Sequence, residues 1–192
     1  MRIDTLSTLT VGFLAGGTGQ RLGGRDKGLL PRDGDLQIHL LRQSVPGWVS
    51  EIIINNSRNA HVYQHFCDRL VSDLSADAGP VAGVLALLYA CCTDWLAVIP
   101  CDQKQLPEAW IGQWQVTMKT GREGCTATDN GRFTPLAILP KTALPMGQAY
   151  FDSGGRKLSE AYAAMELSKQ EYLGAGLDID DWHDLEEDSA EG

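Results

Sequence analysis

The densest group of residues that could hold a ligand lies near the start of the chain, in FLAGGTGQRLGGRDKGLL (13–30). Seven of the 21 glycines fall between positions 12 and 28, and Arg21, Arg25 and Lys27 stand among them. Glycine allows backbone N–H groups to approach a ligand closely, and arginine and lysine neutralise phosphate charge. The stretch therefore predicts a phosphate site, and its length favours a triphosphate.

The glycine spacing excludes two well-known phosphate loops. A dinucleotide-binding G-x-G-x-x-G pattern that starts at Gly17 places its third position on Leu22 instead of glycine. A G-x-x-x-x-G-K-[ST] pattern fits from Gly19 to Gly24, but Arg25 follows where that pattern has lysine. The loop is thus expected to be of another kind, although a plain surface loop is the simpler alternative.

The elements that must position this loop follow a strand-helix-strand rhythm typical of a parallel sheet. The second half is less regular, and no linker or repeat divides the chain. We therefore predict one α/β domain over 1–192, a three-layer α/β/α sandwich with a mostly parallel, Rossmann-like sheet and an acidic tail from about 186. Strands are expected at 11–15, 51–56, 69–73, 95–102, 135–140 and 172–179, and helices at 35–45, 81–92, 108–119 and 154–167.

Charge and composition exclude several classes of protein. The net charge is −9, and residues 178–192 alone hold eight acidic residues and no lysine or arginine. The chain lacks a basic run that could release counterions from nucleic acid, so no nucleic-acid partner is expected. It also lacks an apolar run of about 18 residues and a secretory start, which predicts no membrane contact and a cytoplasmic location. The five cysteines and four histidines show no zinc-ligand spacing.

Asp102 is the most plausible metal ligand in the sequence. It follows the apolar run WLAVIPC (95–101), and the ends of parallel strands face the ligand crevice in α/β folds. Mg²⁺ usually takes one or two carboxylates and completes its shell with water and phosphate oxygens. A carboxylate at this position could instead cap the next helix.

Three stretches in order resemble the molybdenum cofactor guanylyltransferases, which belong to the wider nucleotidyltransferase fold. They are LAGGTGQRLGGRDKGLL, SDLSADAGPVAGVLAL and VIPCDQKQLP, and the first is specific. The resemblance implies transfer of GMP from GTP to the terminal phosphate of molybdopterin, with release of pyrophosphate. It implies catalytic roles for Arg21, Lys27 and Asp102, with Mg²⁺ on Asp102 and Mn²⁺ as the alternative ion. It also implies a GTP site formed by Leu14, Ala15, Gly16, Gly17, Lys27, Asn55, Asp73 and Asp102.

The proposed chemistry requires no general base, because a phosphate monoester is largely dianionic at neutral pH. Two parts of the resemblance leave the function open. The family's glycine-arginine stretch is similar to 153–158, where Arg156 and Lys157 could meet the acceptor's phosphate. The family also commonly carries N-x-N-T-P-E near its end, where this chain has Asp178 and Asp180.

The alternatives are cytidylyl transfer to the same pterin, nucleotidyl transfer to a sugar phosphate, and a noncatalytic nucleotide or cofactor carrier. Under the guanylyltransferase interpretation the partners are GTP and molybdopterin. Transient contact with other molybdenum cofactor biosynthesis proteins or apo-molybdoenzymes is also expected.

Overall fold

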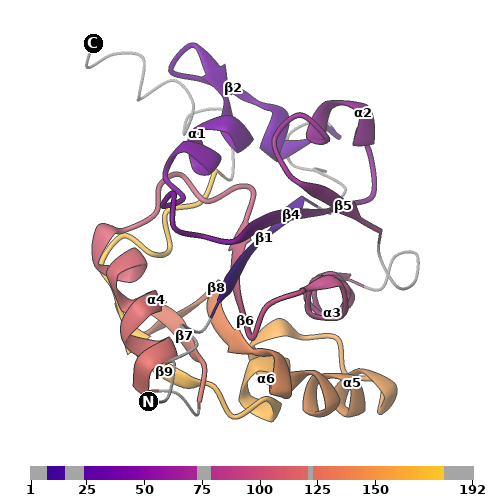
Figure 1. The fold of residues 1–192 in the computed structure, drawn as a ribbon, viewed down its shortest axis with the longest axis vertical. Coiled ribbons are helices and arrows are strands. Elements are labelled where there is room, and N and C mark those ends of the chain that lie inside the picture. The colour runs from indigo at the N-terminus through magenta and orange to yellow at the C-terminus, as the bar shows by residue number, and fades with distance from the viewer. Residues whose placement is uncertain (1–7, 16–23, 73–78, 121–122, 180–192) are drawn as a thin grey trace, which may run out of the picture.

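The computed structural model describes residues 8–15, 24–72, 79–120 and 123–179. Their strands form a seven-stranded sheet in the order β5-β4-β1-β6-β8-β7-β9, shown in Figure 1. A second, two-stranded sheet pairs β2 (Pro31–Arg32) with β3 (Asp35–Leu36). The strands of the large sheet are β1 (Leu9–Ala15), β4 (Glu51–Asn56), β5 (Arg69–Val71), β6 (Trp95–Pro100), β7 (Cys125–Asp129), β8 (Arg132–Pro140) and β9 (Ser168–Glu171).

Helices cover both faces of the large sheet, so the predicted three-layer α/β/α sandwich is confirmed (Figure 1). On one face α1 (Gln37–Gln43) and α4 (Glu108–Thr120) bury apolar side chains such as Leu41 and Trp114 against the strands. On the other face α3 (Gly79–Ala90), α5 (Leu144–Asp152) and α6 (Leu158–Ala164) bury a second apolar cluster. The central strands β1 and β6 are buried along their whole length, as strands covered on both faces should be.

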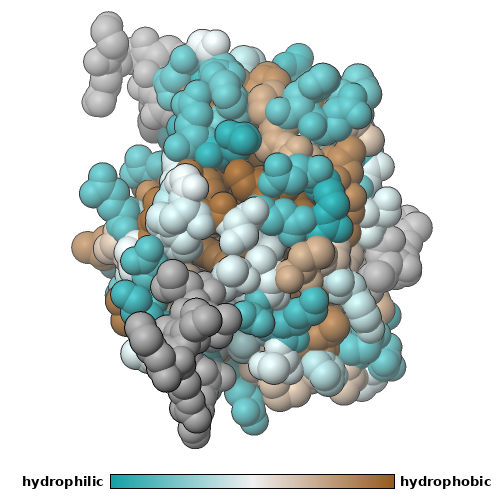
Figure 2. Space-filling model, viewed as in Figure 1, coloured by the Kyte–Doolittle hydropathy of each residue, from teal (hydrophilic) through white to brown (hydrophobic). Residues whose placement is uncertain are grey.

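The remaining helices are short and lie between strands. They are η2 (Lys27–Leu29), α2 (Ala60–Tyr63) and η3 (Lys141–Ala143). No helix within the described ranges is both long and apolar enough to cross a membrane. In Figure 2, hydrophilic residues cover much of the face in view, and apolar residues reach the surface mainly across its middle.

The register of the parallel strands brings their carboxyl ends to one edge. Leu14 of β1 pairs with Asn55 of β4 on one side and with Pro100 of β6 on the other. The chain segments that leave these three strands therefore start beside one another. This edge is where an α/β sheet holds a ligand.

Strand β8 runs antiparallel to β6, with Val98 opposite Ala137. Its start, rather than its end, consequently reaches the ligand edge. The turn before it contains Asn130 and Gly131, both with positive φ (49° and 74°). An Asn-Gly pair of this kind forms the tight turn of a β-hairpin, and here it joins β7 to β8.

Most predicted elements are present, but the end of the chain differs. The strand expected at 172–179 is wrong: the strand is β9, which ends at Glu171, and turns follow it. Gly174 has a φ of 81°, which interrupts an extended strand. Strand β7 and helix α5 were not predicted, and the helix expected from 35 begins only at Gln37 because the two residues before it pair with β2.

Candidate active site

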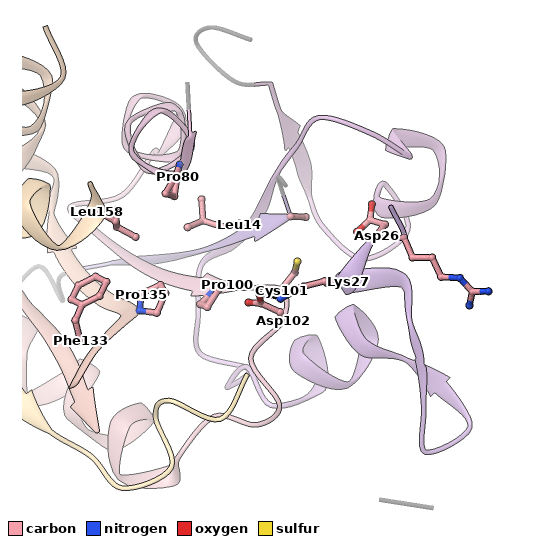
Figure 3. A pocket seen from close by; sticks show the side chains of 12 residues that line it. Leu14, Asp26, Lys27, Pro80, Pro100, Cys101, Asp102, Phe133, Pro135 and Leu158 are labelled. Carbon is pink, nitrogen blue, oxygen red and sulfur yellow. Dashed lines mark hydrogen bonds and ion pairs between the residues drawn. The ribbon is translucent and has the colours of Figure 1, made fainter. Parts of the chain in front are cut away.

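A cavity of about 450 Å³ opens at the carboxyl edge of the sheet (Figure 3). Strands β1 and β6 form its floor, and the segment around η2, the start of α3, the start of β8 and the start of α6 form its walls. Charged and apolar side chains both contribute to its lining. The lining residues are Leu14, Ala15, Arg25, Asp26, Lys27, Pro80, Pro100, Cys101, Asp102, Phe133, Pro135 and Leu158.

An ion pair between Lys27 and Asp102 lies in this cavity. The Lys27 Nζ atom is 2.8 Å from Asp102 Oδ2, although the two residues are 75 positions apart. Their side chains are 22% and 26% exposed, so both can reach a bound ligand. The ammonium group offers charge to phosphate oxygens, and the carboxylate offers oxygen atoms to a divalent cation.

Asp26 holds the segment that carries Lys27. Its Oδ1 atom accepts hydrogen bonds from the Gly28 N–H (3.3 Å) and from the Tyr63 hydroxyl, and its Oδ2 accepts from Asn59 Nδ2 (3.0 Å). Asp26 thereby caps η2 and ties it to α2. Burial and the neighbouring Asp26 raise the pKa of Tyr63 far above its usual range, so its hydroxyl remains a donor. Asp26 is thus used to position Lys27.

Two glycines near this segment are required by packing. A Cβ on Gly28 would lie 2.5 Å from the Tyr63 hydroxyl oxygen, and a Cβ on Gly12 would lie 2.9 Å from Leu87 of α3. Gly24, in contrast, has a φ of 80° and open space around it. Within the part of the glycine-rich stretch that the structure describes, Gly28 therefore serves close packing and Gly24 serves a left-handed backbone.

The segment that follows β9 returns to the same place. The Ile179 N–H donates to the Asp102 carbonyl (2.8 Å), and the Lys104 N–H donates to the Leu177 carbonyl (2.6 Å). The Ile179 side chain is fully buried against Leu30, three residues after Lys27. This segment therefore braces both partners of the ion pair.

Cys101 lines the cavity beside Asp102, but its environment opposes a role as nucleophile. The residue is 6% exposed and packs into the core cluster on the α1 and α4 face. Burial raises the pKa of its thiol well above the usual value, and the Asp102 carboxylate adds to this effect. The thiol consequently stays protonated at neutral pH and fills space.

The structure brings together four of the predicted site residues. Leu14, Ala15, Lys27 and Asp102 all line the cavity. Arg21, Gly16, Gly17 and Asp73 lie outside the described residues, as does Asp180, so their roles stay predictions.

Asn55 lies at the predicted strand end, but it is 2% exposed and is absent from the cavity lining. Its Nδ2 atom donates to the Val71 carbonyl (3.2 Å), which links β4 to β5. Its Oδ1 atom lies 2.6 Å from where a Cβ on Gly83 would be, so it packs tightly against α3. In this structure the amide joins the strands to α3, and contact with a guanine base stays a prediction.

Arg156 and Lys157 are exposed and lie beside the start of α6. Arg156 donates to the carbonyls of Phe151 (2.9 Å) and Gly155 (2.7 Å), and its guanidinium lies 4.1 Å from the centre of the Phe151 ring. Lys157 pairs with Glu160 across 3.3 Å. Neither side chain lines the cavity, so their predicted contact with an acceptor phosphate is untested.

Sequence reasoning missed several residues of the cavity. Asp26 was overlooked because its partners Asn59 and Tyr63 become visible only in three dimensions. Phe133 and Pro135 stand at alternate positions of β8, and alternation of this kind places side chains on one face. The sequence predicted this strand only from 135, and the Asn130-Gly131 pair was the signal that could have placed its start at 132.

Solved structures place the fold among the nucleotidyltransferases. Molybdopterin-guanine dinucleotide biosynthesis protein A from Archaeoglobus fulgidus matches with a TM-score of 0.72 and 18% identity, over 93% of this chain and 96% of that one. A 4-diphosphocytidyl-2C-methyl-D-erythritol synthase from Anaerococcus prevotii matches with a TM-score of 0.73 and 10% identity, over 96% and 98%. At these identities the likeness shows the fold alone.

Sequence relatives define the family. The model of the MobA-like NTP transferase domain matches residues 11–167. A molybdenum cofactor guanylyltransferase from Pseudomonas putida is 34% identical over 82% of this chain and 84% of its own length. One from Cupriavidus taiwanensis is 37% identical over 82% and 83%. The chain belongs to the molybdenum cofactor guanylyltransferase family.

Proposed function

We propose that the protein transfers GMP from GTP to the terminal phosphate of molybdopterin and releases pyrophosphate. The observation that carries this proposal is the Lys27–Asp102 pair, held in a cavity at the strand ends of a chain in this family. The alternative of a noncatalytic carrier is disfavoured because both charged groups are present, partly exposed and braced from several sides.

The reaction joins an oxygen of the acceptor phosphate to the α-phosphorus of GTP. The bond between the α-phosphorus and its bridging oxygen breaks, and pyrophosphate leaves with the electron pair. Because the attacking phosphate is already ionised, the protein's task is to align the groups and neutralise their charge. This requirement agrees with a cavity that is lined by four charged residues, two of them the Lys27–Asp102 pair, and whose cysteine is buried and protonated.

Lys27 is the group whose ammonium can move from Asp102 to the phosphate oxygens of GTP. In the structure its ammonium is paired with Asp102, and it lies on a capped segment within the glycine-rich stretch. A triphosphate offers several charged oxygens to the same ammonium, so binding of GTP would draw Lys27 away from the carboxylate. The free carboxylate is then available to a cation.

Asp102 suits a magnesium ion better than a tightly enclosed metal. Among the residues that the structure describes, no three His, Cys, Asp or Glu side chains gather to form a complete protein shell. One accessible carboxylate is what Mg²⁺ needs when phosphates and water supply its other ligands, and Mn²⁺ accepts the same oxygens. Such an ion would neutralise charge on the GTP oxygens as pyrophosphate departs.

The test measures nucleotide choice and turnover on the same purified protein. With Mg²⁺ present, GTP at about 100 times its dissociation constant should stabilise the fold by about 2.7 kcal/mol and raise the melting temperature by several degrees. CTP and ATP should raise it much less. Pyrophosphate should then appear only when GTP and molybdopterin are both added.

Equal shifts with the three nucleotides would contradict the choice of GTP, and transfer from CTP alone would favour cytidylyl transfer. Binding of GTP with no pyrophosphate release in the presence of molybdopterin would favour the carrier. The cytoplasmic location and the contacts with other cofactor-biosynthesis proteins stay predictions from the sequence.

A further inference from the structure

The cavity has two chemically different ends. Asp26 and Lys27 lie at one end, and Asp102 lies between them and the opposite wall (Figure 3). That wall is apolar and contains Phe133, Pro135 and Leu158. These apolar side chains offer a phosphate neither positive charge nor hydrogen-bond donors. The wall therefore suits another part of a substrate.

Phe133 is the aromatic residue of this wall, and it remains 37% exposed although it stands on a strand of the main sheet. Its ring packs against Tyr162 of α6, with ring centres 5.8 Å apart and planes at 55°. Tyr162 itself is buried, and its hydroxyl donates to the Pro135 carbonyl (3.0 Å). One side of the Phe133 ring is therefore supported by a fixed neighbour, while the rest of the ring is available to the cavity.

The backbone around Phe133 is fixed as well. Phe133 is opposite Thr128 in the β7–β8 ladder, and the buried Thr134 hydroxyl donates to the Ala127 carbonyl (2.9 Å). Because side chains alternate along a strand, Phe133 and Pro135 face the cavity while Thr134 points the other way. The aromatic surface is thus preorganised and would cost little entropy to use.

The order of strands assigns this wall to one substrate. The Lys27–Asp102 pair lies above β1 and β6, and β8 lies on the far side of β6 from β1. Lys27, which we assign to the GTP phosphates, lies at the end of the cavity opposite Phe133 (Figure 3), so the triphosphate occupies the Lys27 end. The β8 side is left for the acceptor, whose phosphate approaches the α-phosphorus of GTP from the opposite direction.

We propose that Phe133, supported by Tyr162, is a stacking platform for the planar fused heteroaromatic ring of the phosphorylated acceptor. This inference rests on the proposed function and specifies where the acceptor lies. A flat ring with polar edges and apolar faces fits an aromatic side chain flanked by Pro135 and Leu158, and stacking of this kind is largely independent of edge chemistry. Phe133 then favours acceptors with a planar ring over those without one, and it takes no part in bond making.

The experiment replaces Phe133 by Ala, Leu, Tyr and Trp. Phe133→Ala should raise the KM for molybdopterin about tenfold and leave the KM for GTP and the GTP-induced thermal shift unchanged, as expected for loss of one stacking contact. Phe133→Tyr and Phe133→Trp should keep the acceptor KM near its original value, whereas Phe133→Leu should not. The matched control is Tyr89→Ala, which removes an aromatic ring that is 53% exposed on α3 and does not line the cavity.

A binding measurement separates this inference from the proposed function. A fluorescent pterin that carries a phosphate monoester is titrated into each variant without GTP, and its quenching on stacking gives the affinity. Weaker binding in Phe133→Ala and Phe133→Leu, with no change in Tyr89→Ala, supports the platform even if no guanylyl transfer is detected. An unchanged affinity for the pterin, or a weaker affinity for GTP alone, would overturn the stacking platform. Neither result would contradict the proposed guanylyl transfer. If Phe133→Ala fails to fold, the Leu variant decides.

Discussion

The two halves of the large sheet contribute differently to the cavity. In the first half, β5, β4, β1 and β6 all run parallel, and their carboxyl ends bring Leu14 and Asp102 to one edge beside Lys27. In the second half β8 is antiparallel to both β6 and β7, and its start brings Phe133 and Pro135 to that same edge. The first half supplies the charges and the second half supplies the apolar wall.

The first half of the sheet therefore carries the charged groups proposed for the reaction, and the second half carries the wall proposed to bind the acceptor. Parallel strands place every carboxyl end at one edge, so charged residues from distant positions can converge there. A reversed strand presents its first residues at that edge, and these can vary without moving the ion pair. Nucleotidyltransferases that differ in their acceptors could therefore share the first half and vary the second.

The largest effect should come from Asp102→Asn, which removes a charge and keeps the shape. We expect kcat to fall by about 10²–10³-fold, because the carboxylate is assigned to the ion that stabilises the transition state. Stability should change by less than about 1 kcal/mol, since the ion pair is partly exposed. Steady-state kinetics with GTP and molybdopterin, together with urea unfolding, measure both quantities.

The control for Asp102→Asn is Asp152→Asn on α5, where the carboxylate is exposed and accepts only from Gln148 among the bonds described (2.8 Å). Its kinetics should match those of the unaltered protein. Retention of full turnover in Asp102→Asn would remove the metal assignment.

Lys27→Met should have the next largest effect. Methionine keeps most of the apolar stem and removes the charge, so kcat/KM for GTP should fall by about 10²-fold while the acceptor's affinity changes little. Lys119→Met, on the exposed surface of α4, serves as the control. An equal loss of affinity for both substrates would show that the charged end of the cavity does not distinguish them. It would contradict the division of roles between the two halves of the sheet.

The sequence predicted the first half better than the second for physical reasons. Strand 11–15 is buried throughout and appears as the continuous apolar run VGFLA, and strand 51–56 has an apolar centre, III, that is buried at Ile53 and Ile54. Strand β7 is the short, half-polar run CTATD, which carries no comparable signal. The strand at 168–171, SKQE, is polar and mostly exposed, so nothing in its composition marks it.

The same contrast applies to the site. Lys27 and Asp102 were found from a motif and from a strand end. Phe133 and Ile179 contribute through partners far away in the chain, and only the folded structure reveals those partners.

Stability at alkaline pH offers a smaller test that compares one buried thiol in each half. Burial raises the pKa of Cys101 well above its usual value and the pKa of Cys125 to about 11, whereas the pKa of an unfolded thiol is about 8.5. Between these values the native state holds more protons than the unfolded state. Each thiol should therefore lower the free energy of unfolding by up to about 1.4 kcal/mol per pH unit as pH rises above about 8.5.

Urea unfolding between pH 7 and 10 measures this slope. Cys101→Ala and Cys125→Ala should each reduce the slope by a similar amount. Slopes are compared instead of absolute stabilities, because each substitution also leaves a cavity. Two separate unfolding transitions, each sensitive to one thiol, would mean that the halves unfold independently.

The smallest expected effect concerns Ile179, where the chain that leaves the second half braces the first. Ile179→Val removes one buried methylene group and should destabilise the protein by about 1 kcal/mol. The matched control, Ile138→Val in β8, removes the same group from an equally buried site and should cost a similar amount. The two variants should differ in kinetics, because only Ile179 packs against Leu30 and has its N–H on the Asp102 carbonyl. A slightly looser ion pair should lower kcat by about two- to fivefold with KM for both substrates unchanged. If both variants retain full turnover, Ile179 only stabilises the fold, and the first half positions its charges without help from the second.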